Sequence, residues 1–442
     1  MDAARTEHEV GHLVIESGRI TAAGGGAAPP LPGVPRVDGR GCVATPGLVN
    51  THHHLYQWST RGLAVDATLF EWLTTLYPVW GHLDEDIVRP AATAGLSWLV
   101  RSGCTTSMDH HYVFPADGGD LLAAEIEAAR QVGLRFFPTR GSMDLGQRSG
   151  GLPPDHVVED LDTILAATAD AIDRHHDPSP GSMLRVGVAP CSPFSVTGQL
   201  LIEAAALARD KGVRLHTHLA ETLDEEAYCR ETHGCGPVDY VSGLGWLGPD
   251  VWLAHGVHLD DAAITALAAA GTGVAHCPTS NARLGAGIAR TRELRAAGVP
   301  VGLGVDGAAS NEASSLLEEA RHALLFARAR GGPRAMSVRD ALELATMGGA
   351  RVLGWDDEIG SLEVGKLADV ALWRVDTLPH VEIVDPVAAL VLGSPPPLEL
   401  LLVGGRPVVE AGRVVTTDEE RVTADSAAAT RWLLGRAGVI SA

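Results

Sequence analysis

The sequence is poor in lysine, in paired cysteines and in long apolar runs, and each shortage excludes a class of protein. Only Lys211 and Lys366 are lysines among 34 basic residues, against 55 acidic ones, so the net charge is -21. Such an acidic chain is unsuited to nucleic acid or an anionic membrane surface as a partner. No apolar run reaches the roughly 18 residues that span a bilayer.

Cysteine is scarce and scattered along the chain. The six cysteines include no C-x-x-C pair, so neither a zinc ribbon nor a thioredoxin-like motif is present. The sequence shows no signal peptide, and we therefore expect reduced, mostly buried thiols in a cytoplasmic protein. With 442 residues, 45% apolar and 20% charged, the chain suits one large domain and a smaller one.

Helical patterns alternate with short apolar runs through most of the chain. This pattern predicts eight strands separated by helices, and such alternation is typical of a parallel sheet. Eight units favour an α/β fold of the closed (β/α)8 TIM-like barrel type over a doubly wound open sheet. The predicted strands are 43–54, 104–111, 134–142, 184–192, 213–221, 251–258, 272–281 and 299–306.

Both ends of the chain differ from the middle in their sequence pattern. Residues 9–24 have the pattern of a β-hairpin, and 359–373 and 400–415 have short alternating strands with Gly turns. We predict that the two ends join into a small β-sandwich domain beside a catalytic barrel domain. The predicted bounds are 1–45 and 356–442 for the β-sandwich domain, and 46–355 for the barrel.

Two further segments are predicted with less detail. Residues 55–80 hold six aromatic side chains, Trp72 among them, and are expected to form a long loop. Aromatic residues at this density either cover a site or pack into the core, and the sequence does not decide between the two. Residues 421–438 are expected to form a short surface helix.

Three histidines follow the first apolar run directly. His52 and His54 are two residues apart, so they point to the same side of an extended backbone. Two neutral imidazoles on one face supply half of a tetrahedral metal site. A surface histidine cluster is the alternative, but the run follows a predicted strand and precedes an aromatic-rich segment.

The other predicted strands also end in polar and metal-binding residue types. In a barrel of this kind the carboxyl ends of all strands meet at one face. More than half of the 19 histidines lie at such ends, which indicates a metal-centred site, although any single one could be an ordinary buried histidine. The remaining candidates are Asp109, His110, His111, Cys191, Ser192, His216, His218, Glu221, His255, His258, His276, Asn281 and Asp306.

Two rival motifs point elsewhere and are set aside. Residues 302–307 fit G-x-G-x-x-G, but they lie near the eighth strand and carry an Asp in the turn. A dinucleotide loop would open straight into a helix of an early βαβ unit. Residues 190–193, Pro-Cys-Ser-Pro, lack the second cysteine of the P-C-x-x-C motif found in small zinc deaminases.

The motifs PGLVNTHHH, HTHLAET, LAHGVHL, HCPTSN and LGVDG together resemble the amidohydrolase superfamily. The likeness spans nearly the whole chain, because GSLEVGKLADVALW and LLVGGRPVVEAGR resemble the flanking β domain of that family. The resemblance implies an aminohydrolase of purine, pterin or triazine rings. Family members usually begin with one more strand than this chain, which leaves the completeness of the small domain open.

The resemblance also implies a set of metal ligands. His52, His54, His218 and Asp306 would hold one divalent cation, with Zn²⁺ favoured over Fe²⁺. His216 is the less suitable ligand, because the ligand of the family stands three residues before the glutamate. Three neutral imidazoles leave zinc strongly Lewis acidic, so bound water approaches a pKa of ~7.

The catalytic residues implied by the resemblance are Glu221, His255 and Asp306. Asp306 can accept a proton from the attacking water, and Glu221 can pass a proton to a ring nitrogen and to the departing amine. His255 would hold the water and, as a cation, stabilise the oxygen of the tetrahedral centre.

The aromatic-rich segment most resembles enzymes that deaminate 8-oxoguanine, whose relatives act on isoxanthopterin and hydroxylated triazines. Gln57 would read the ring edge, because an amide both donates and accepts hydrogen bonds. Trp72 would stack on the ring or pack in the core. We expect a homo-oligomer that converts this heterocyclic substrate to urate and ammonia. Guanine or isoxanthopterin deamination and triazine hydrolysis are alternatives, whereas a non-catalytic scaffold would have lost ligands that are present here.

Overall fold

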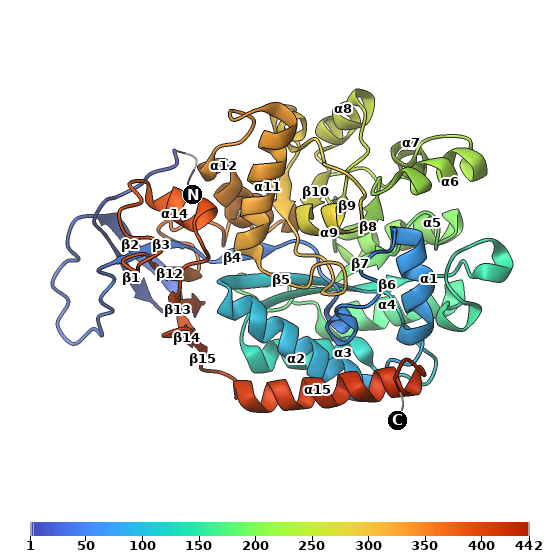
Figure 1. The fold of residues 1–442 in the computed structure, drawn as a ribbon, viewed down its shortest axis with the longest axis horizontal. Helices are drawn as coiled ribbons and strands as arrows, with labels where there is room; N and C mark the ends of the chain where they lie inside the picture. The colour runs from blue at the N-terminus through green and yellow to red at the C-terminus, as the bar shows by residue number, and fades with distance from the viewer. Residues whose placement is uncertain (1, 3, 441–442) are drawn as a thin grey trace.

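The computed structural model describes residues 2 and 4–440, and its centre is a closed barrel of eight parallel strands (Figure 1). The strands follow one another around the barrel in chain order, which confirms the predicted (β/α)8 fold. They are β4 (Leu48–Asn50), β5 (Cys104–His111), β6 (Arg135–Ser142), β7 (Gly187–Pro190), β8 (Leu215–Leu219), β9 (Val251–His255), β10 (Gly273–His276) and β11 (Val301–Leu303).

Helices connect the strands and cover the outside of the barrel. All residues of β5 and β6 are buried, as expected for strands that face a filled interior on one side and helices on the other. The connecting helices are η1 (Leu55–Thr60), α1 (Leu69–Trp80), α2 (Glu85–Arg101), α3 (Leu121–Val132), η2 (Gln147–Ser149), η3 (Asp155–Val157), α4 (Leu161–His175), α5 (Gly198–Lys211), α6 (Leu223–His233), α7 (Pro237–Gly243), α8 (Asp261–Ala270), α9 (Pro278–Arg283), α10 (Thr291–Ala296), α11 (Leu316–Gly331), α12 (Val338–Glu343), η4 (Leu344–Gly348) and α13 (Gly349–Leu353).

The first predicted strand is wrong as a single element. Its apolar run divides at Gly47 into β3 (Cys42–Pro46), which belongs to a terminal sheet, and β4, which enters the barrel. A Cβ at Gly47 would lie 2.2 Å from the side chain of Thr105, so a larger residue does not fit at this crossing without a shift. The chain therefore passes directly from the terminal sheet to the strand that precedes His52.

The predicted loop over 55–80 is also wrong in its second half, which is the helix α1. Thr68 and Glu71 form a capping box at its N-terminus, a signal that the sequence offers. Pro78 lies in the last turn, and the aromatic side chains of the helix pack inward; Trp72 is 3% exposed. The segment therefore presents a helix face, and not a mobile loop, to the end of the barrel.

Several other element ends differ from the prediction. The predicted strand 272–281 stops at His276, because Pro278 begins α9. The helical segment between β8 and β9 consists of two helices, α6 and α7, and Gly234, with a positive φ of 76°, ends the first of them.

The two ends of the chain form two sheets beside the barrel (Figure 1). One sheet is a hairpin, and the other joins β3 to four strands from the C-terminal part, with β12 antiparallel to β3. The division into domains at 45/46 and 355/356 stays a prediction. The terminal elements are β1 (Gly11–Glu16), β2 (Arg19–Gly25), β12 (Val370–Arg374), α14 (Pro386–Leu392), β13 (Leu398–Val403), β14 (Arg406–Glu410), β15 (Arg413–Val414) and α15 (Glu419–Arg436).

The C-terminal helix α15 belongs spatially to the barrel. It is longer than the predicted short helix and runs along α2 (Figure 1). Leu433 is fully buried and Ala429 nearly so, whereas Trp432 is 59% exposed. Among the described residues, no helix combines the length and apolar character needed to cross a membrane.

Candidate metal centre and pocket

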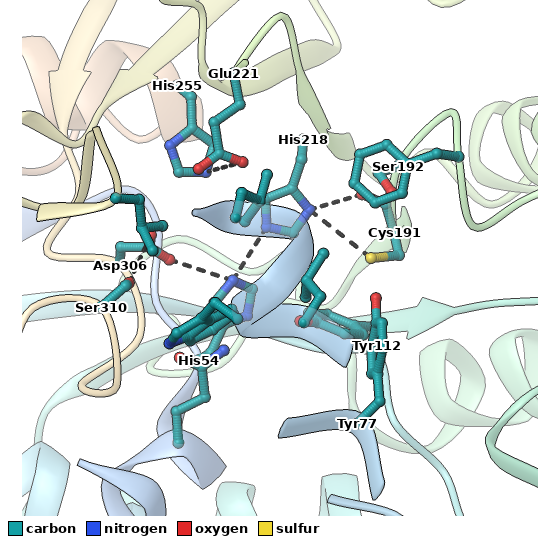
Figure 2. Close-up of a pocket in the computed structure, with 16 residues that line it drawn as sticks. His54, Tyr77, Tyr112, Cys191, Ser192, His218, Glu221, His255, Asp306 and Ser310 are labelled. Atoms are coloured by element: carbon teal, nitrogen blue, oxygen red, sulfur yellow. Dashed lines mark hydrogen bonds and ion pairs between the residues drawn. The ribbon is translucent and has the colours of Figure 1, made fainter. Parts of the chain in front are cut away.

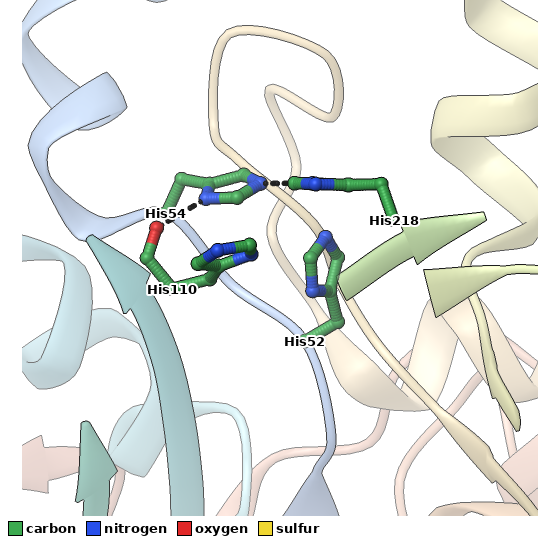
Figure 3. A group of neighbouring side chains, drawn as sticks. All are labelled: His52, His54, His110 and His218. Carbon is green, nitrogen blue, oxygen red and sulfur yellow. Dashed lines mark hydrogen bonds between the residues drawn. The ribbon is translucent and has the colours of Figure 1, made fainter. Parts of the chain in front are cut away.

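The four predicted metal ligands come together at the carboxyl end of the barrel. The Nε2 atoms of His52 and His54 each lie 3.3 Å from Oδ1 of Asp306, and Nε2 of His54 lies 3.1 Å from Nε2 of His218 (Figure 3). All four side chains are buried. Their positions follow from β4, β8 and β11, whose ends meet at this face.

Hydrogen bonds fix the tautomers of the three histidines. Nδ1 of His54 lies 2.7 Å from the backbone oxygen of His110, and Nδ1 of His218 lies 2.7 Å from that of Cys191. A carbonyl only accepts, so both Nδ1 atoms donate and both Nε2 atoms keep a lone pair. Burial lowers the pKa of His54 to about 4 and that of His218 well below its usual range, so both are neutral.

His52 has the same tautomer, with its proton on Nδ1, because this atom is hydrogen-bonded to a second imidazole. His216 donates from Nδ1 to the backbone oxygen of Trp252 at 2.9 Å, so its Nε2 accepts from Nδ1 of His52 at 2.9 Å. Nε2 of His52 is buried and has no hydrogen-bond partner in the described part of the chain. His216 thus orients a candidate ligand instead of serving as one.

This donor set fits a divalent cation. Nitrogen lone pairs that face each other at 3.1 Å repel unless a cation lies between them. Tetrahedral zinc with Zn–N bonds of about 2.0–2.1 Å places its ligand atoms about 3.4 Å apart, close to the separations found here. The neutral imidazoles and one carboxylate are therefore spaced as ligands of a single ion.

Asp306 is held in place by donors that the sequence analysis missed. Ser280 and Ser310 donate to Oδ2 at 2.6 and 3.1 Å, and the Gly307 N–H donates to Oδ1 at 2.7 Å. Its φ of 61° is strained for a residue with a side chain, as is common at functional sites. Burial would raise the pKa of Asp306, but the neighbouring His52, His255 and His54 outweigh it and hold that pKa well below its usual range.

Glu221 and His255 form a second pair beside the ligands (Figure 2). Oε2 of Glu221 lies 3.6 Å from Nε2 of His255, whose Nδ1 donates to Oδ1 of Asn281 at 2.9 Å. Burial raises the pKa of Glu221 to about 7. Burial lowers the pKa of His255, but Glu221 and Asp306 outweigh it and leave that pKa above its usual value. The pair can therefore exchange a proton near neutral pH.

Glu225 holds the backbone that carries Glu221, and the sequence analysis did not predict this role. Its carboxyl accepts the backbone N–H groups of Ala220 and Glu221, both at 2.9 Å. The side chain is fully buried at the start of α6. The four acids in the sequence ETLDEE were the only available signal, and charge alone does not separate a buried member from its exposed neighbours.

The pocket beside the candidate ligands is narrow, and α1 supplies part of its lining. Its cavity of about 30 Å³ has room for on the order of two water molecules. Oε1 of Gln57 and the hydroxyl of Tyr77 are buried at this pocket without a hydrogen-bond partner among residues 4–440. Trp72 also lines the pocket, while its indole N–H donates to the backbone oxygen of Ala309 at 3.2 Å.

Comparisons with known proteins identify relatives over almost the full chain. Residues 43–408 match the sequence model of the amidohydrolase family. The chain is 46% identical over 429 residues to the 8-oxoguanine deaminase of Pseudomonas aeruginosa, covering 96% of this chain and 95% of that protein. It is 40% identical over 431 residues to an isoxanthopterin deaminase of an unknown prokaryotic organism, covering 92% and 89%.

Solved structures show the same architecture. The zinc complex of atrazine chlorohydrolase TrzN from Arthrobacter aurescens TC1 superposes with a TM-score of 0.89 at 35% identity, covering 95% of this chain and 94% of that chain. The likeness therefore extends from the barrel to the terminal sheets.

Proposed function

Since this chain belongs to the amidohydrolase family and is a hydrolase of carbon–nitrogen bonds, we propose that it deaminates 8-oxoguanine. Water replaces the exocyclic amino group, and the products are urate and ammonia. The observation that carries the proposal is the 46% identity to an 8-oxoguanine deaminase across 96% of this chain. The gathering of three imidazoles and one carboxylate in one pocket supports the same reaction class.

In this scheme His52, His54, His218 and Asp306 hold one divalent cation, with Zn²⁺ preferred to Fe²⁺. The tautomers of the three histidines support this, because each leaves an Nε2 lone pair at the centre. When bound, zinc supplies the Lewis acidity that makes water a nucleophile near neutral pH.

The proton transfers fall to Asp306, Glu221 and His255. Asp306, ionised at neutral pH, takes a proton from the attacking water. Glu221, with a pKa of about 7, protonates a ring nitrogen and, once it has regained a proton of the attacking water from Asp306, protonates the departing amine. The second proton of that water restores Glu221. His255 lies beside Glu221 and stabilises negative charge on the attacking oxygen.

Ring recognition falls to Gln57, with Trp72 and Tyr77 around it. Oε1 of Gln57 and the hydroxyl of Tyr77, which have no partner among the residues that the structure describes, suit a flat ring whose edge offers both donors and acceptors. Trp72 is buried on the inner face of α1, where it either stacks on the ring or only shapes the pocket. The expected homo-oligomeric assembly stays a prediction.

A substitution at Gly307 tests the role assigned to Gln57. A Cβ at residue 307 would lie 1.7 Å from Oε1 of Gln57, so Gly307→Ala must push the amide out of position. We expect kcat/KM to fall about 10- to 100-fold, the effect of losing a buried hydrogen bond, with metal content unchanged. Steady-state kinetics and metal analysis measure both.

The double variant Gln57→Ala/Gly307→Ala provides the control for this prediction. Gln57→Ala alone should cause a similar loss, and adding Gly307→Ala to it should change little, because the clashing atom is gone. Equal kinetics for Gly307→Ala and the parent protein would remove Gln57 from the recognition of the ring.

A substrate screen tests the proposed function itself. Purified zinc-loaded protein is assayed for ammonia release from 8-oxoguanine, guanine and isoxanthopterin, and for turnover of a chlorinated triazine. We expect the highest kcat/KM with 8-oxoguanine and stoichiometric urate. Preference for isoxanthopterin or guanine would move the assignment to that ring, and turnover of the triazine alone would replace the deaminase assignment by a triazine hydrolase.

A further inference from the structure

A second cluster of ionisable side chains lies outside the pocket, at the end of β5. Asp109, His111 and Glu125 are fully buried, and one ligand-type atom of each lies within 4.8 Å of the others. Asp109 and His111 were predicted to face the candidate site. Because side chains alternate along a strand, only His110 between them points to the histidine cluster.

The Asp109 carboxylate is bonded to the segment that carries the candidate ligands. Its Oδ1 accepts the backbone N–H of Leu55 at 2.6 Å, and Leu55 both follows His54 and begins η1. His110 adds two bonds to the same segment: its N–H donates to the backbone oxygen of His53 at 2.8 Å, and its own oxygen accepts from His54. Of these three bonds, only that of Asp109 depends on a side chain of β5.

Glu125 and His111 back the carboxyl of Asp109. Oε1 of Glu125 lies 2.8 Å from Nδ1 of His111, and Nε2 of that ring donates to the backbone oxygen of Val113 at 2.8 Å. Oδ2 of Asp109 and Oε2 of Glu125 are buried without a hydrogen-bond partner within the described residues. Because Nε2 donates, Nδ1 of the neutral ring accepts, so Oε1 of Glu125 carries one proton toward His111. A second proton, shared between Oδ2 of Asp109 and Oε2 of Glu125, would satisfy both of these oxygens.

The electrostatic setting favours retention of that proton. Burial raises the pKa of Asp109 well above its usual range, and burial raises the pKa of Glu125 to about 8. Two ionised carboxylates at this distance would repel each other and pull Asp109 from Leu55. The shared proton therefore keeps Oδ1 of Asp109 directed at η1.

We propose that Asp109 is a positioning residue: backed by Glu125 and His111, it fixes the turn from His54 to Leu55. This turn aims Nε2 of His54 at the other candidate ligands and sets the start of η1, which carries Gln57 into the pocket. The inference rests on the proposed function only in that His54 binds metal. A second cation bound by Asp109, His111 and Glu125 is the competing use of the same residues.

Two substitutions distinguish the positioning role of Asp109 from a second cation site. Asp109→Asn keeps an oxygen for the Leu55 N–H and places an N–H where the shared proton stood. Asp109→Ala removes the acceptor. We expect Asp109→Asn to keep zinc affinity, measured by chelator competition, and kcat/KM within about threefold of the parent protein. Asp109→Ala should lose about 10- to 100-fold in zinc affinity, as when groups that orient metal ligands are removed.

The outcomes decide between the two uses even if Asp109→Ala does not fold. A loss of zinc affinity greater than about tenfold in Asp109→Asn would overturn the positioning role. A second zinc ion per chain in the parent protein that is lost in Asp109→Asn would also overturn it. One zinc per chain in both proteins supports it. Failure to deaminate any of the rings would refute the proposed function, whereas the zinc affinities would still test the role of Asp109.

Discussion

Replacing His218 by alanine should remove both the bound metal and turnover. His218 supplies one of three neutral imidazoles, and its Nε2 faces that of His54 at 3.1 Å. Without it, the remaining two imidazoles and one carboxylate leave a cation one ligand short in a buried cavity. Metal content of the purified protein by elemental analysis, which also identifies the metal, and ammonia release measure the two losses.

A matched control separates this effect from the loss of any buried histidine. His380 is 2% exposed and is bonded to Thr377 and Ser394, far from the barrel end. His380→Ala should lower the melting temperature but keep one metal per chain. A folded His218→Ala protein that retains metal at full occupancy would refute the ligand assignment.

Replacing Glu221 by glutamine should abolish most of the turnover while leaving the metal in place. The amide has the shape of the carboxyl group but cannot donate an acidic proton to the ring and the leaving amine. A general acid or base contributes about 10²- to 10⁴-fold, so kcat should fall by that amount. Glu226→Gln, in the helix α6 that begins two residues after Glu221, changes a carboxylate bonded to Arg230 and should have near-parental kinetics.

The pH profile provides a second measure of the same group. Burial raises the pKa of Glu221 to about 7, and only the protonated acid donates. The rate should therefore be highest below about pH 7 and fall roughly tenfold per unit above it. The residual activity of Glu221→Gln should lack this alkaline fall. An unchanged alkaline limb in that variant would assign the titration to another group.

The barrel and the pairing of His52 with His54 could be predicted from the sequence because both depend on local patterns, whereas His218 and Asp306 became candidate ligands through the family resemblance. Alternating helices and strands predict the barrel, and the spacing of His52 and His54 places two imidazoles on one face. The division at Gly47 was missed because a continuous apolar run has the same sequence pattern whether its residues belong to one sheet or to two. The helix α1 was missed because the dense aromatic residues were interpreted as part of a loop, although Thr68 and Glu71 form a capping box.

The groups that support the site were beyond reach of the sequence for a different reason. Ser280 and Ser310 are ordinary hydroxyl residues until the fold brings them to Asp306. Asp109 was a candidate site residue because it lies at the end of a predicted strand. Strand alternation sends it to the opposite side, and only the position of Leu55 reveals what it does there.

The narrow cavity beside α1 limits the number of water molecules that can lie next to the candidate ligands. A space of about 30 Å³ is smaller than a two-ring heterocycle, so side chains that line the pocket must move before the proposed substrate can enter. In the proposed reaction the bound ring would exclude bulk water, and the nucleophile would be one of the few water molecules already inside.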